Sequence, residues 1–440
     1  MTNFNPVRKL NVIRTLSSGK KTPVGVLAQN RKGVYFQYEA EYLRQFGNLS
    51  PFFLESENSL QKAPSDPHGG LHGVFGDCLP DGWGLLLQDR IFRQKGIMPH
   101  QVTGLDRLAF VGHRGMGALS FEPESPYFQD DHQVSLAALG MEAQALFDGQ
   151  TEEVLSSLVA AGSSGGARPK AQLFFSPGEY TNCRTYAEKG DEAWLVKFTS
   201  SNLSLGHEEG VCEAAYLTLA KLANLEPPEW KLLDAPKESG AKAWLALKRF
   251  DWVYSDNCLE KRRLQDSPSG RKHMHSICGL LDVDFRMPTL DYQDLIKASR
   301  QLCKSPAVGQ LQFRRAMFNL FASNQDDHTK NWAFLQSDDG QWNPAPFYDV
   351  TFSPHPFNQH ATSFMGFGNK PPLKAIQALA VKAGFKNWNV AQQTIQEIVD
   401  VISGFPLVAK ELGVHKDTVN MIESTLEQRR QENSDLHSMP

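Results

Sequence analysis

Alternating apolar and polar residues predict short strands in the first part of the chain. Residues 24–29 and 33–38 alternate in this way on either side of Asn30–Gly33, whose glycine suits a tight turn, so we expect a β-hairpin. Residues 1–20 are polar, and we expect them to be poorly ordered. Strand patterns recur further along the chain, at 117–122, 171–175, 193–198 and 243–250.

Apolar residues spaced three or four positions apart predict helices, and these dominate the second half of the chain. The earlier helices are expected at 83–94, at 133–147, from about 152 to 162, and at 208–222. The later ones are expected at 291–302, 308–322, 372–383, 388–403 and 416–431. Together the patterns predict an α+β fold. We expect three regions, at 1–125, 126–250 and 251–440, of which the last is mainly helical.

The composition is that of an ordinary globular protein and argues against several classes. The chain has 440 residues, 41% of them hydrophobic and 21% charged, which is enough for two or three domains. Its net charge of −4 argues against a general nucleic-acid-binding or membrane-binding surface. The six cysteines include no C-x-x-C pair, and no apolar run is long enough to cross a bilayer. We therefore expect a cytoplasmic protein with reduced thiols and no membrane contact.

Three polar residues in the second half of the chain have the spacing of a phosphoryl-transfer site. Asp326 precedes Asn331 by five positions, and Asp349 follows one strand later. In protein kinases this spacing supplies a carboxylate that takes the proton of the nucleophile, and an amide and a second carboxylate that hold magnesium. We therefore predict Asp326 as the catalytic base and Asn331 and Asp349 as metal ligands. The alternative is a polar loop whose side chains cap backbone groups.

A glycine-rich segment, residues 162–170, has the composition of a phosphate-binding loop. Glycine lets the backbone approach a ligand closely, and consecutive N–H groups bind phosphate oxygens. The segment matches neither common glycine-rich nucleotide motif, so a flexible surface loop is the alternative. Two serines at its start, Ser163 and Ser164, are candidate phosphate acceptors. The residues expected to contact nucleotide are Gly165, Gly166, Ala167, Arg168, Pro169 and Lys170.

A lysine inside an apolar strand is the next candidate. An ammonium group at Lys197 is costly there unless it is paired. A nucleotide phosphate and Glu213, in the helix that follows, would pair it as a lysine–glutamate couple does in kinases. A lysine that reaches solvent at a sheet edge is the alternative. Lys248, Arg249 and Phe250 end the last strand of this region, where a hinge would contact adenine through backbone groups, although Phe250 also suits a core position.

Other polar residues carry weaker signals. His328, between Asp326 and Asn331, is expected either to contact phosphate or to hold its loop through a backbone bond. Asp77 and Asp81, in a turn-rich stretch, are expected to serve turns or helix caps. His273 and His275 form the only H-x-H pair, and we expect them to face solvent rather than to bind a hydrolytic metal.

Taken together, these motifs resemble those of the HipA-like serine/threonine kinases, toxins of bacterial toxin–antitoxin pairs. The resemblance spans about residues 20–400. Residues Asp326–Asn331 are similar to the family's D-x-H-x-K-N catalytic loop, and Pro346–Asp349 to its metal-binding P-x-Y-D element. These matches add Lys330 and Tyr348 to the residues expected near the nucleotide.

The first half of the chain resembles the same family. Residues 163–170 are similar to its phosphate loop, and Leu79–Gly82 to a signature of its N-terminal subdomain. Lys197 matches its ATP-contacting lysine and Glu213 its helix glutamate. Residues 247–251 are similar to its hinge, although Lys248 stands where the family often has an acidic residue.

The resemblance implies a two-lobed protein-kinase-like fold that uses ATP and Mg²⁺, with nucleotide between the lobes. It implies phosphorylation of a serine or threonine in a protein, and the best-known target of the family is an aminoacyl-tRNA synthetase. It also implies that autophosphorylation of a phosphate-loop serine, Ser163 or Ser164, switches the kinase off. A small DNA-binding antitoxin is the implied partner, through which the toxin contacts DNA only indirectly.

Two other functions remain open at this point. A small-molecule phosphotransferase shares the same loop chemistry. A catalytically silent partner in a DNA-binding repressor complex is the second alternative, and the intact Asp326, Asn331, Asp349 and Lys197 argue against it.

Overall fold

The chain forms two compact units, and each is built from separate segments. The computed structural model describes residues 4–127, 130–151, 154, 156–162, 164–254 and 270–437. Unit 1 comprises residues 1–207, 233–282 and 335–341, and unit 2 comprises residues 208–232, 283–334 and 342–440. The chain therefore passes from one unit to the other after residues 207, 232, 282, 334 and 341.

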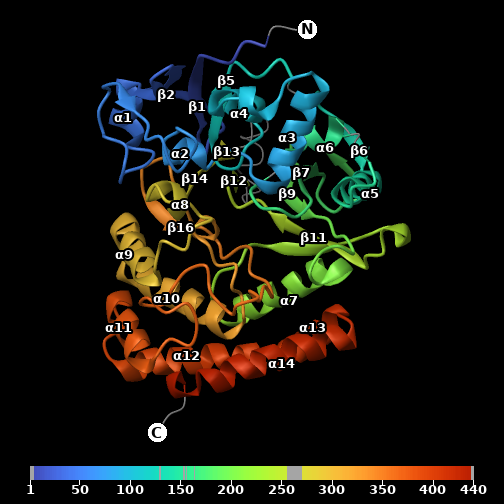
Figure 1. Ribbon diagram of the computed structural model, residues 1–440, viewed down its shortest axis with the longest axis vertical. Coiled ribbons are helices and arrows are strands. Elements are labelled where there is room, and N and C mark those ends of the chain that lie inside the picture. The colour runs from blue at the N-terminus through green and yellow to red at the C-terminus, as the bar shows by residue number, and fades with distance from the viewer. Residues whose placement is uncertain are drawn as a thin grey trace. The chain divides into compact units, whose positions relative to one another are not determined.

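Unit 1 contains an antiparallel sheet with strand order β4-β3-β2-β1-β5. Figure 1 labels its strands β1, β2 and β5. Its strands are β1 Lys9–Thr15, β2 Lys21–Asn30, β3 Gly33–Tyr38, β4 Gln61–Lys62 and β5 Leu119–Glu122. The predicted hairpin is confirmed, because β2 and β3 pair up to the turn at Asn30 and Gly33. The helices in this part of the chain, between β3 and β5, are α1 Ala40–Phe46, α2 Gly73–Gly76, α3 Gly82–Gln94 and α4 Gly104–Val111. Phe36, Phe75 and Phe121 are fully buried in the core that the sheet shares with α2 and α4.

The expectation that residues 1–20 are poorly ordered was wrong for most of this stretch. Strand β1 pairs with β2 on one side and with β5 on the other, so it lies inside the sheet. Leu10 and Val12 are buried, and so is Arg14, whose guanidinium donates to Tyr42 at 2.9 Å and to Gln336 at 3.0 Å. The alternation was hidden because a charged residue takes one of the inward positions.

A second sheet in unit 1 carries the predicted phosphate loop and Lys197. Five of its strands follow the order β11-β9-β7-β8-β6. They are β6 Gln133–Ser135, β7 Lys170–Phe175, β8 Asn182–Arg184, β9 Glu192–Lys197 and β11 Ala243–Lys248, and β10 spans Trp230–Asp234. Trp194, Trp244 and Phe175 are fully buried in the core beside it. The smaller elements β12 Trp252–Val253, β13 Gly270–Arg271, β14 His273–Ser276 and α8 Ile277–Leu280 complete the unit.

The helix predicted at 133–147 begins later than expected. Residues 133–135 form β6, which pairs with β8, and helix α5 spans Leu136–Phe147. This pairing with a distant segment overrides the local apolar spacing, from which the helix boundary was predicted. Gly140 brings α5 close to the sheet, since a Cβ atom there would lie 2.1 Å from the Trp244 ring. The next helix is a short one, α6 Ser156–Ala160.

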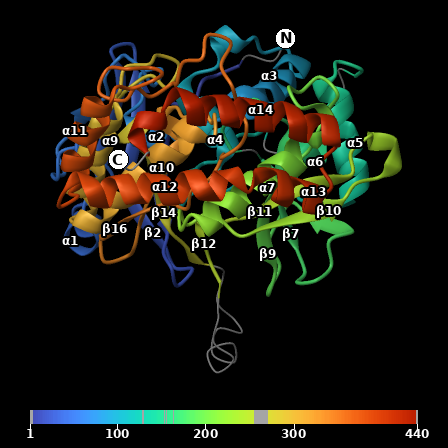
Figure 2. The ribbon, with the colours of Figure 1, turned by 90° about the horizontal axis from the view of Figure 1, so that it is seen from below.

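Unit 2 is mainly helical, as predicted for this part of the chain. Its helices are α7 Glu209–Leu222, α9 Tyr292–Cys303, α10 Pro306–Phe321, α11 Leu373–Ala383, α12 Trp388–Ser403, α13 Phe405–Leu412 and α14 Lys416–Glu432. Helix α10 contacts α9, α11, α12 and α14, and α7 contacts α13. In Figure 2, α12 and α14 run beside each other. Strands β15 Ala333–Gln336 and β16 Trp342–Pro344 follow α10 in the chain.

The segment from 345 to 372 contains neither helix nor strand and connects β16 to α11. It is held by isolated bridges, such as Asn324 with Ser353 and Asp291 with Ser363, rather than by a continuous ladder. Among the described residues, no helix is both long and apolar enough to cross a membrane.

Candidate catalytic and nucleotide-binding residues

The predicted base lies on an exposed loop after helix α10. This helix ends at Phe321, and the chain turns at Ser323, which has a φ of +51°. The side chain of Asp326 is 72% exposed. The side-chain amide of Asn331 donates to the backbone oxygen of Asp326 at 2.8 Å. The structure therefore brings Asp326 and Asn331 together in one loop, residues 326–331, which we call the catalytic loop.

The next residue, Asp327, is buried and anchors this loop. Its carboxylate accepts hydrogen bonds from the Tyr292 hydroxyl and from the His360 ring, the latter at 2.8 Å. It also accepts the backbone N–H groups of Ala361 at 2.9 Å and Thr362 at 3.3 Å. Four donors compensate a carboxylate for its lost hydration. The network therefore fixes the backbone beside Asp326, the predicted base.

A second hydrogen-bond chain connects helix α10 to the base. Asn319 on α10 donates to the Tyr292 hydroxyl at 2.9 Å and accepts from the Asn324 amide at 2.8 Å. The Ser353 hydroxyl donates to the Asn324 side-chain oxygen at 2.9 Å, and the N–H of Asp326 donates to the Ser353 hydroxyl at 3.3 Å. The position of the base thus follows from a packed helix rather than from a flexible loop.

Asp349, the second predicted metal ligand, has a left-handed backbone with a φ of +52°. This conformation costs energy in a residue other than glycine, and such residues gather at functional sites. Beside it, the Tyr348 hydroxyl donates to the backbone oxygen of Lys330 at 2.6 Å. The structure therefore joins the Pro346–Asp349 element to the catalytic loop.

Two further residues of the catalytic loop contact Phe285. The ring of His328 meets it edge-on with centroids 5.3 Å apart, and the Lys330 ammonium lies 4.5 Å from its centre. His328 Nε2 is 3.9 Å from the Asp326 carboxylate. Within the part of the chain that the structure describes, the buried Nδ1 of His328 has no hydrogen-bond partner. The ring is therefore held by packing, whereas a phosphate contact stays a prediction.

The predicted ligands suit magnesium, which prefers oxygen atoms. The amide nitrogen of Asn331 is bound to the Asp326 backbone, and this orients the amide oxygen away from that contact. Asp349 contributes a carboxylate. Two oxygen donors of this kind match the metal that phosphoryl transfer requires.

In unit 1, the phosphate loop is bound to the start of helix α3. The N–H of Gly166 donates to the Asp81 carboxylate, and the N–H of Trp83 donates to the Gly166 oxygen at 3.0 Å. The Lys170 ammonium donates to the Gly165 oxygen at 2.6 Å. Gly166 has a φ of +103°, a conformation that requires glycine. Gly166, one of the glycines predicted to contact phosphate, therefore lets the backbone come close to the carboxylate of Asp81.

The role expected for Asp81 was only partly right. It precedes α3 at the capping position, but its side chain makes no capping hydrogen bond to that helix. Its carboxylate instead accepts a backbone N–H of the phosphate loop. The Asp81 carboxylate thus accepts a hydrogen bond from a backbone N–H group that a phosphate oxygen could otherwise use.

Two buried lysines lie directly opposite each other on adjacent strands. Lys170 begins β7 and Lys197 ends β9, and the two are partners in the antiparallel register. They are 3% and 6% exposed. Opposed residues of antiparallel strands project to the same face, where like charges destabilise a sheet. Glu213 is buried in α7 of unit 2, and its pairing with Lys197 stays a prediction.

The predicted hinge residues have structural partners inside unit 1. Lys248 forms an ion pair with Glu192 at 2.9 Å. The buried Arg249 pairs with Asp251, and its backbone N–H donates to a β9 carbonyl at 2.9 Å. That N–H is therefore already used within the sheet. Adenine contacts through neighbouring backbone groups, including those of the half-buried Phe250, stay a prediction.

Of the two candidate phosphate acceptors, Ser163 lies outside the described residues. Ser164 lines a cavity of about 60 Å³ together with Gly162 and Gly165 of the phosphate loop. The remaining wall comes from 77–80, α3, the end of α4 and the turn that follows it: Asp77, Cys78, Leu79, Pro80, Gly84, Leu87, Gln88, Phe110, Val111, Arg114, Gly115, Met116, and Val159 of α6.

The pair His273 and His275 is buried, so the expectation of solvent-facing rings was wrong. His275 Nδ1 lies 2.6 Å from the Asp77 carboxylate, and its Nε2 lies 2.9 Å from the Ser50 hydroxyl. Asp77 also accepts the N–H of Ser276 at 2.7 Å, so its carboxylate binds a distant segment of unit 1 rather than serving the local turn or helix cap expected for it. The order serine–histidine–aspartate is that of a hydrolase triad. However, Ser50 is 2% exposed and has no access to a substrate, so the arrangement is structural.

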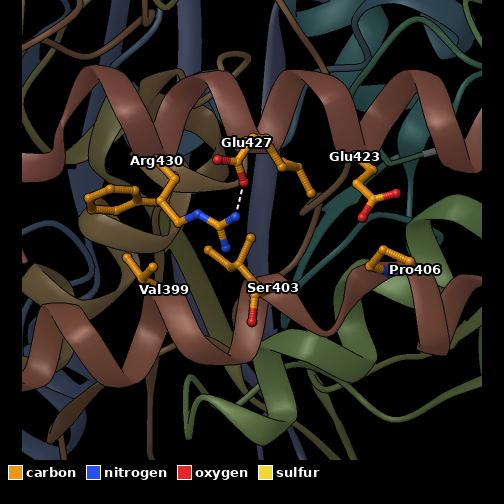
Figure 3. Close-up of a pocket in the computed structure, with 9 residues that line it drawn as sticks. Val399, Ser403, Pro406, Glu423, Glu427 and Arg430 are labelled. Atoms are coloured by element: carbon orange, nitrogen blue, oxygen red, sulfur yellow. Dashed lines mark ion pairs between the residues drawn. The ribbon is translucent and has the colours of Figure 1, made fainter.

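A groove in unit 2 lies between helices rather than at the catalytic loop. It is walled by side chains of α12 and α14, with Pro406 of α13 and Phe321 of α10, and has a volume of about 40 Å³ (Figure 3). Arg430 and Glu427, both on α14, form an ion pair in its wall. It contains no residue that the sequence predicts for catalysis or nucleotide binding.

Sequence analysis missed three residues that shape the site: Asp327, His360 and Tyr292. The doubled aspartate at 326–327 was the available signal, since one carboxylate of such a pair can serve the fold. Their partners lie 33 to 35 residues apart in the chain, beyond the reach of any local pattern.

Comparison with known proteins finds two family models in the chain. The HipA-like C-terminal domain matches residues 162–404, and the HipA N-terminal domain matches residues 18–122. The first alone covers 243 of the 440 residues, counting from 162 through 404. None of the curated proteins matches the chain.

A solved structure shares the fold. A chain from the Shewanella oneidensis complex of the toxin–antitoxin proteins HipA and HipB with operator DNA has a TM-score of 0.68 and 16% identity. The match covers 97% of this chain and 100% of that one. It confirms the predicted α+β, kinase-like fold. The Helicobacter pylori proinflammatory kinase CtkA matches with a TM-score of 0.37 and 14% identity, over 63% of this chain and 92% of its own.

Proposed function

Because the chain belongs to the HipA-like family, we propose that it is an ATP- and magnesium-dependent kinase that phosphorylates serine or threonine in proteins. The observation that carries the proposal is the presentation of Asp326. Its side chain is exposed, whereas the nearby Asn324 and Asp327 are held by buried hydrogen bonds. A general base needs this combination of access and fixed position.

Unit 1 supplies the residues proposed to bind nucleotide. Lys170 and Lys197, opposed on β7 and β9, place two positive charges on one face of the sheet. The backbone of the phosphate loop offers N–H groups to phosphate oxygens. These residues hold and neutralise the phosphates, and no covalent step is needed from them.

Unit 2 supplies the residues proposed for the chemical step. Asp326 takes the proton of the acceptor hydroxyl. The hydroxyl oxygen forms a bond to the γ-phosphorus of ATP, and the bond between that phosphorus and the oxygen of the leaving ADP breaks. Asn331 and Asp349 would hold magnesium, which neutralises charge on the phosphates. The buried network around Asp327 keeps the base in place during transfer.

We propose that the protein acts in the cytoplasm as a toxin restrained by a small DNA-binding antitoxin. The solved relative is a complex of HipA with HipB and operator DNA, which supports a partner of this kind. The proposed target is a cellular protein, of which an aminoacyl-tRNA synthetase is the family type. Phosphorylation of Ser163 or Ser164 in its own phosphate loop is proposed to inactivate the kinase.

Intact-mass analysis after incubation with ATP and Mg²⁺, followed by peptide mapping, tests the proposal. We expect one added phosphate within residues 162–170. Asp326→Asn should reduce its incorporation roughly 100-fold or more, the contribution of a general base. Because Asp326 is exposed, this variant should keep the melting temperature of the wild type.

Asp417→Asn is the matched control, since Asp417 is also an exposed aspartate of unit 2. It should incorporate phosphate at the wild-type rate. Wild-type protein that starts without phosphate and gains none would contradict the proposed kinase activity. Equal rates in the wild type and Asp326→Asn would instead remove Asp326 from the role of base.

A further inference from the structure

Phe357 is the most exposed large apolar residue in the described part of the chain, at 80%. A single exposed apolar residue is common on protein surfaces and needs no function. Phe357 differs from such residues in how firmly its turn is held and in what holds it.

Residues 355–358 form a turn that is fixed by side chains. The N–H of Asn358 donates to the His355 oxygen at 2.8 Å, and the N–H of Phe357 donates to His355 Nδ1 at 3.3 Å. The side chain of Gln325 bridges the turn, since it accepts the His355 N–H at 2.7 Å and donates to the Asn358 side chain at 2.6 Å. A turn held in this way loses little backbone conformational entropy when a partner binds to it.

The residue that bridges the turn is the neighbour of the base. The N–H of Ala361 donates both to the backbone oxygen of Gln325 at 3.1 Å and to the Asp327 carboxylate at 2.9 Å. Both neighbours of Asp326 are therefore bonded to the segment that carries Phe357. The backbone of Phe357 is consequently held near the backbone of Asp326, the carboxylate of which is the proposed destination of an acceptor hydroxyl.

We propose that Phe357 docks the protein substrate by packing against an apolar side chain close to the phosphorylated serine or threonine. The inference rests on the proposed function and names the substrate feature that this site selects. A polypeptide whose hydroxyl reaches Asp326 continues on both sides of it, so a nearby side chain can cover the ring. Aromatic residues that become buried in this way carry much of the binding energy at protein interfaces.

The experiment measures how strongly the enzyme prefers peptides with an apolar residue near the serine, rather than its activity alone. Peptides with one central serine flanked by alanines are compared with peptides in which each flanking position in turn is leucine. For the wild type we expect leucine at one or two positions to raise kcat/KM about tenfold, the gain from one well-packed anchor. Phe357→Ala should lower the rate on the leucine peptides to its own rate on the all-alanine peptide, and it should bind ATP as the wild type does.

Two variants separate docking from folding. Phe357→Leu keeps an apolar side chain and should retain most of the preference. Phe53→Ala removes another exposed phenylalanine, which is 56% exposed in unit 1, and should behave as the wild type. The ratio of the two peptide rates does not depend on the fraction of folded enzyme.

Several outcomes would overturn the inference. If Phe357→Ala keeps the leucine preference, or the wild type has none, the substrate does not dock on Phe357, and another protein or a second copy covers the ring. If the variant loses the all-alanine rate as well, the ring supports the catalytic loop instead. Absence of phosphate transfer by the wild type, to peptides or to itself, overturns the proposed function together with this inference.

Discussion

At the scale of single residues, the site depends on two adjacent aspartates with opposite surroundings. Asp326 is exposed and available for chemistry, whereas Asp327 is buried and binds four donors. The spacing to Asn331 and Asp349 was enough to single out Asp326. It gave no role for Asp327, because that role depends on Tyr292 and on residues 360–362, which only the folded chain brings close.

We predict that Asp327→Asn slows catalysis without weakening nucleotide binding. An amide in place of the carboxylate turns one acceptor into a donor and faces the N–H and O–H groups now bound there. Stability should fall by about 1–3 kcal/mol, the cost of an unsatisfied buried group. Turnover should fall at least about tenfold, because the backbone of the base loses its anchor. Steady-state kinetics that separate kcat from the KM for ATP, together with thermal melts, check both effects.

Tyr292→Phe is the milder companion to this variant. It removes one of the four donors to Asp327 and keeps the aromatic ring in the core. Its effect on stability should be about 1 kcal/mol. An Asp327→Asn enzyme with wild-type kcat would show that the network serves only the fold.

At the scale of elements, local patterns were most reliable where an element has one apolar face. The helices from α9 to α14 that were predicted lie within a few residues of their expected positions, because a spacing of three or four apolar residues is a property of the segment itself. Strands β1 and β6 were missed because pairing with distant strands defines them. The three residues of β6 are not buried, and in β1 the inward Arg14 is charged. The opposition of Lys170 and Lys197 likewise depends on register, which single strands do not reveal.

The contact between the phosphate loop and helix α3 predicts that loss of the Asp81 charge strengthens ATP binding. Asp81 places a carboxylate on the N–H of Gly166, where a nucleotide phosphate would compete with it. Asp81→Asn keeps the shape and removes the negative charge, so ATP should bind a few-fold more tightly, since like charges near 4 Å repel by about 1 kcal/mol in water. Titration with a fluorescent ATP analogue measures the dissociation constant.

Asp66→Asn, at an exposed position of unit 1, is the control for a general change of charge. It should leave the dissociation constant of ATP unchanged. Weaker ATP binding by Asp81→Asn would mean that Asp81 orders the loop for nucleotide rather than competing with it.

At the scale of the whole molecule, acid should destabilise unit 1. Burial lowers the pKa of His72 to about 4, and the smaller effect of Asp282 opposes this. Because the unfolded chain binds a proton near pH 6.5 and the folded chain does not, stability falls as the pH drops from 6.5 toward 4. At pH 5 this group alone should cost about 2 kcal/mol relative to pH 7.

Denaturant unfolding at pH 7 and pH 5 measures this loss, and hydrogen exchange assigns it to unit 1. His72→Gln carries no titrating ring, so its stability should change less between the two pH values by about 2 kcal/mol. Identical pH dependence in this variant and in the wild type would exclude His72 as the source. His273, whose pKa burial also lowers, acts in the same direction.

The division of unit 2 into three stretches of chain has a consequence for its synthesis on the ribosome. The catalytic loop is made before residues 342–440, which include helices α11, α12 and α14, the neighbours of α10. A nascent chain that has just produced Asp326 therefore lacks most of the helices on which that residue's position depends. Chains whose translation stops before residue 342 should therefore lack the proposed kinase activity.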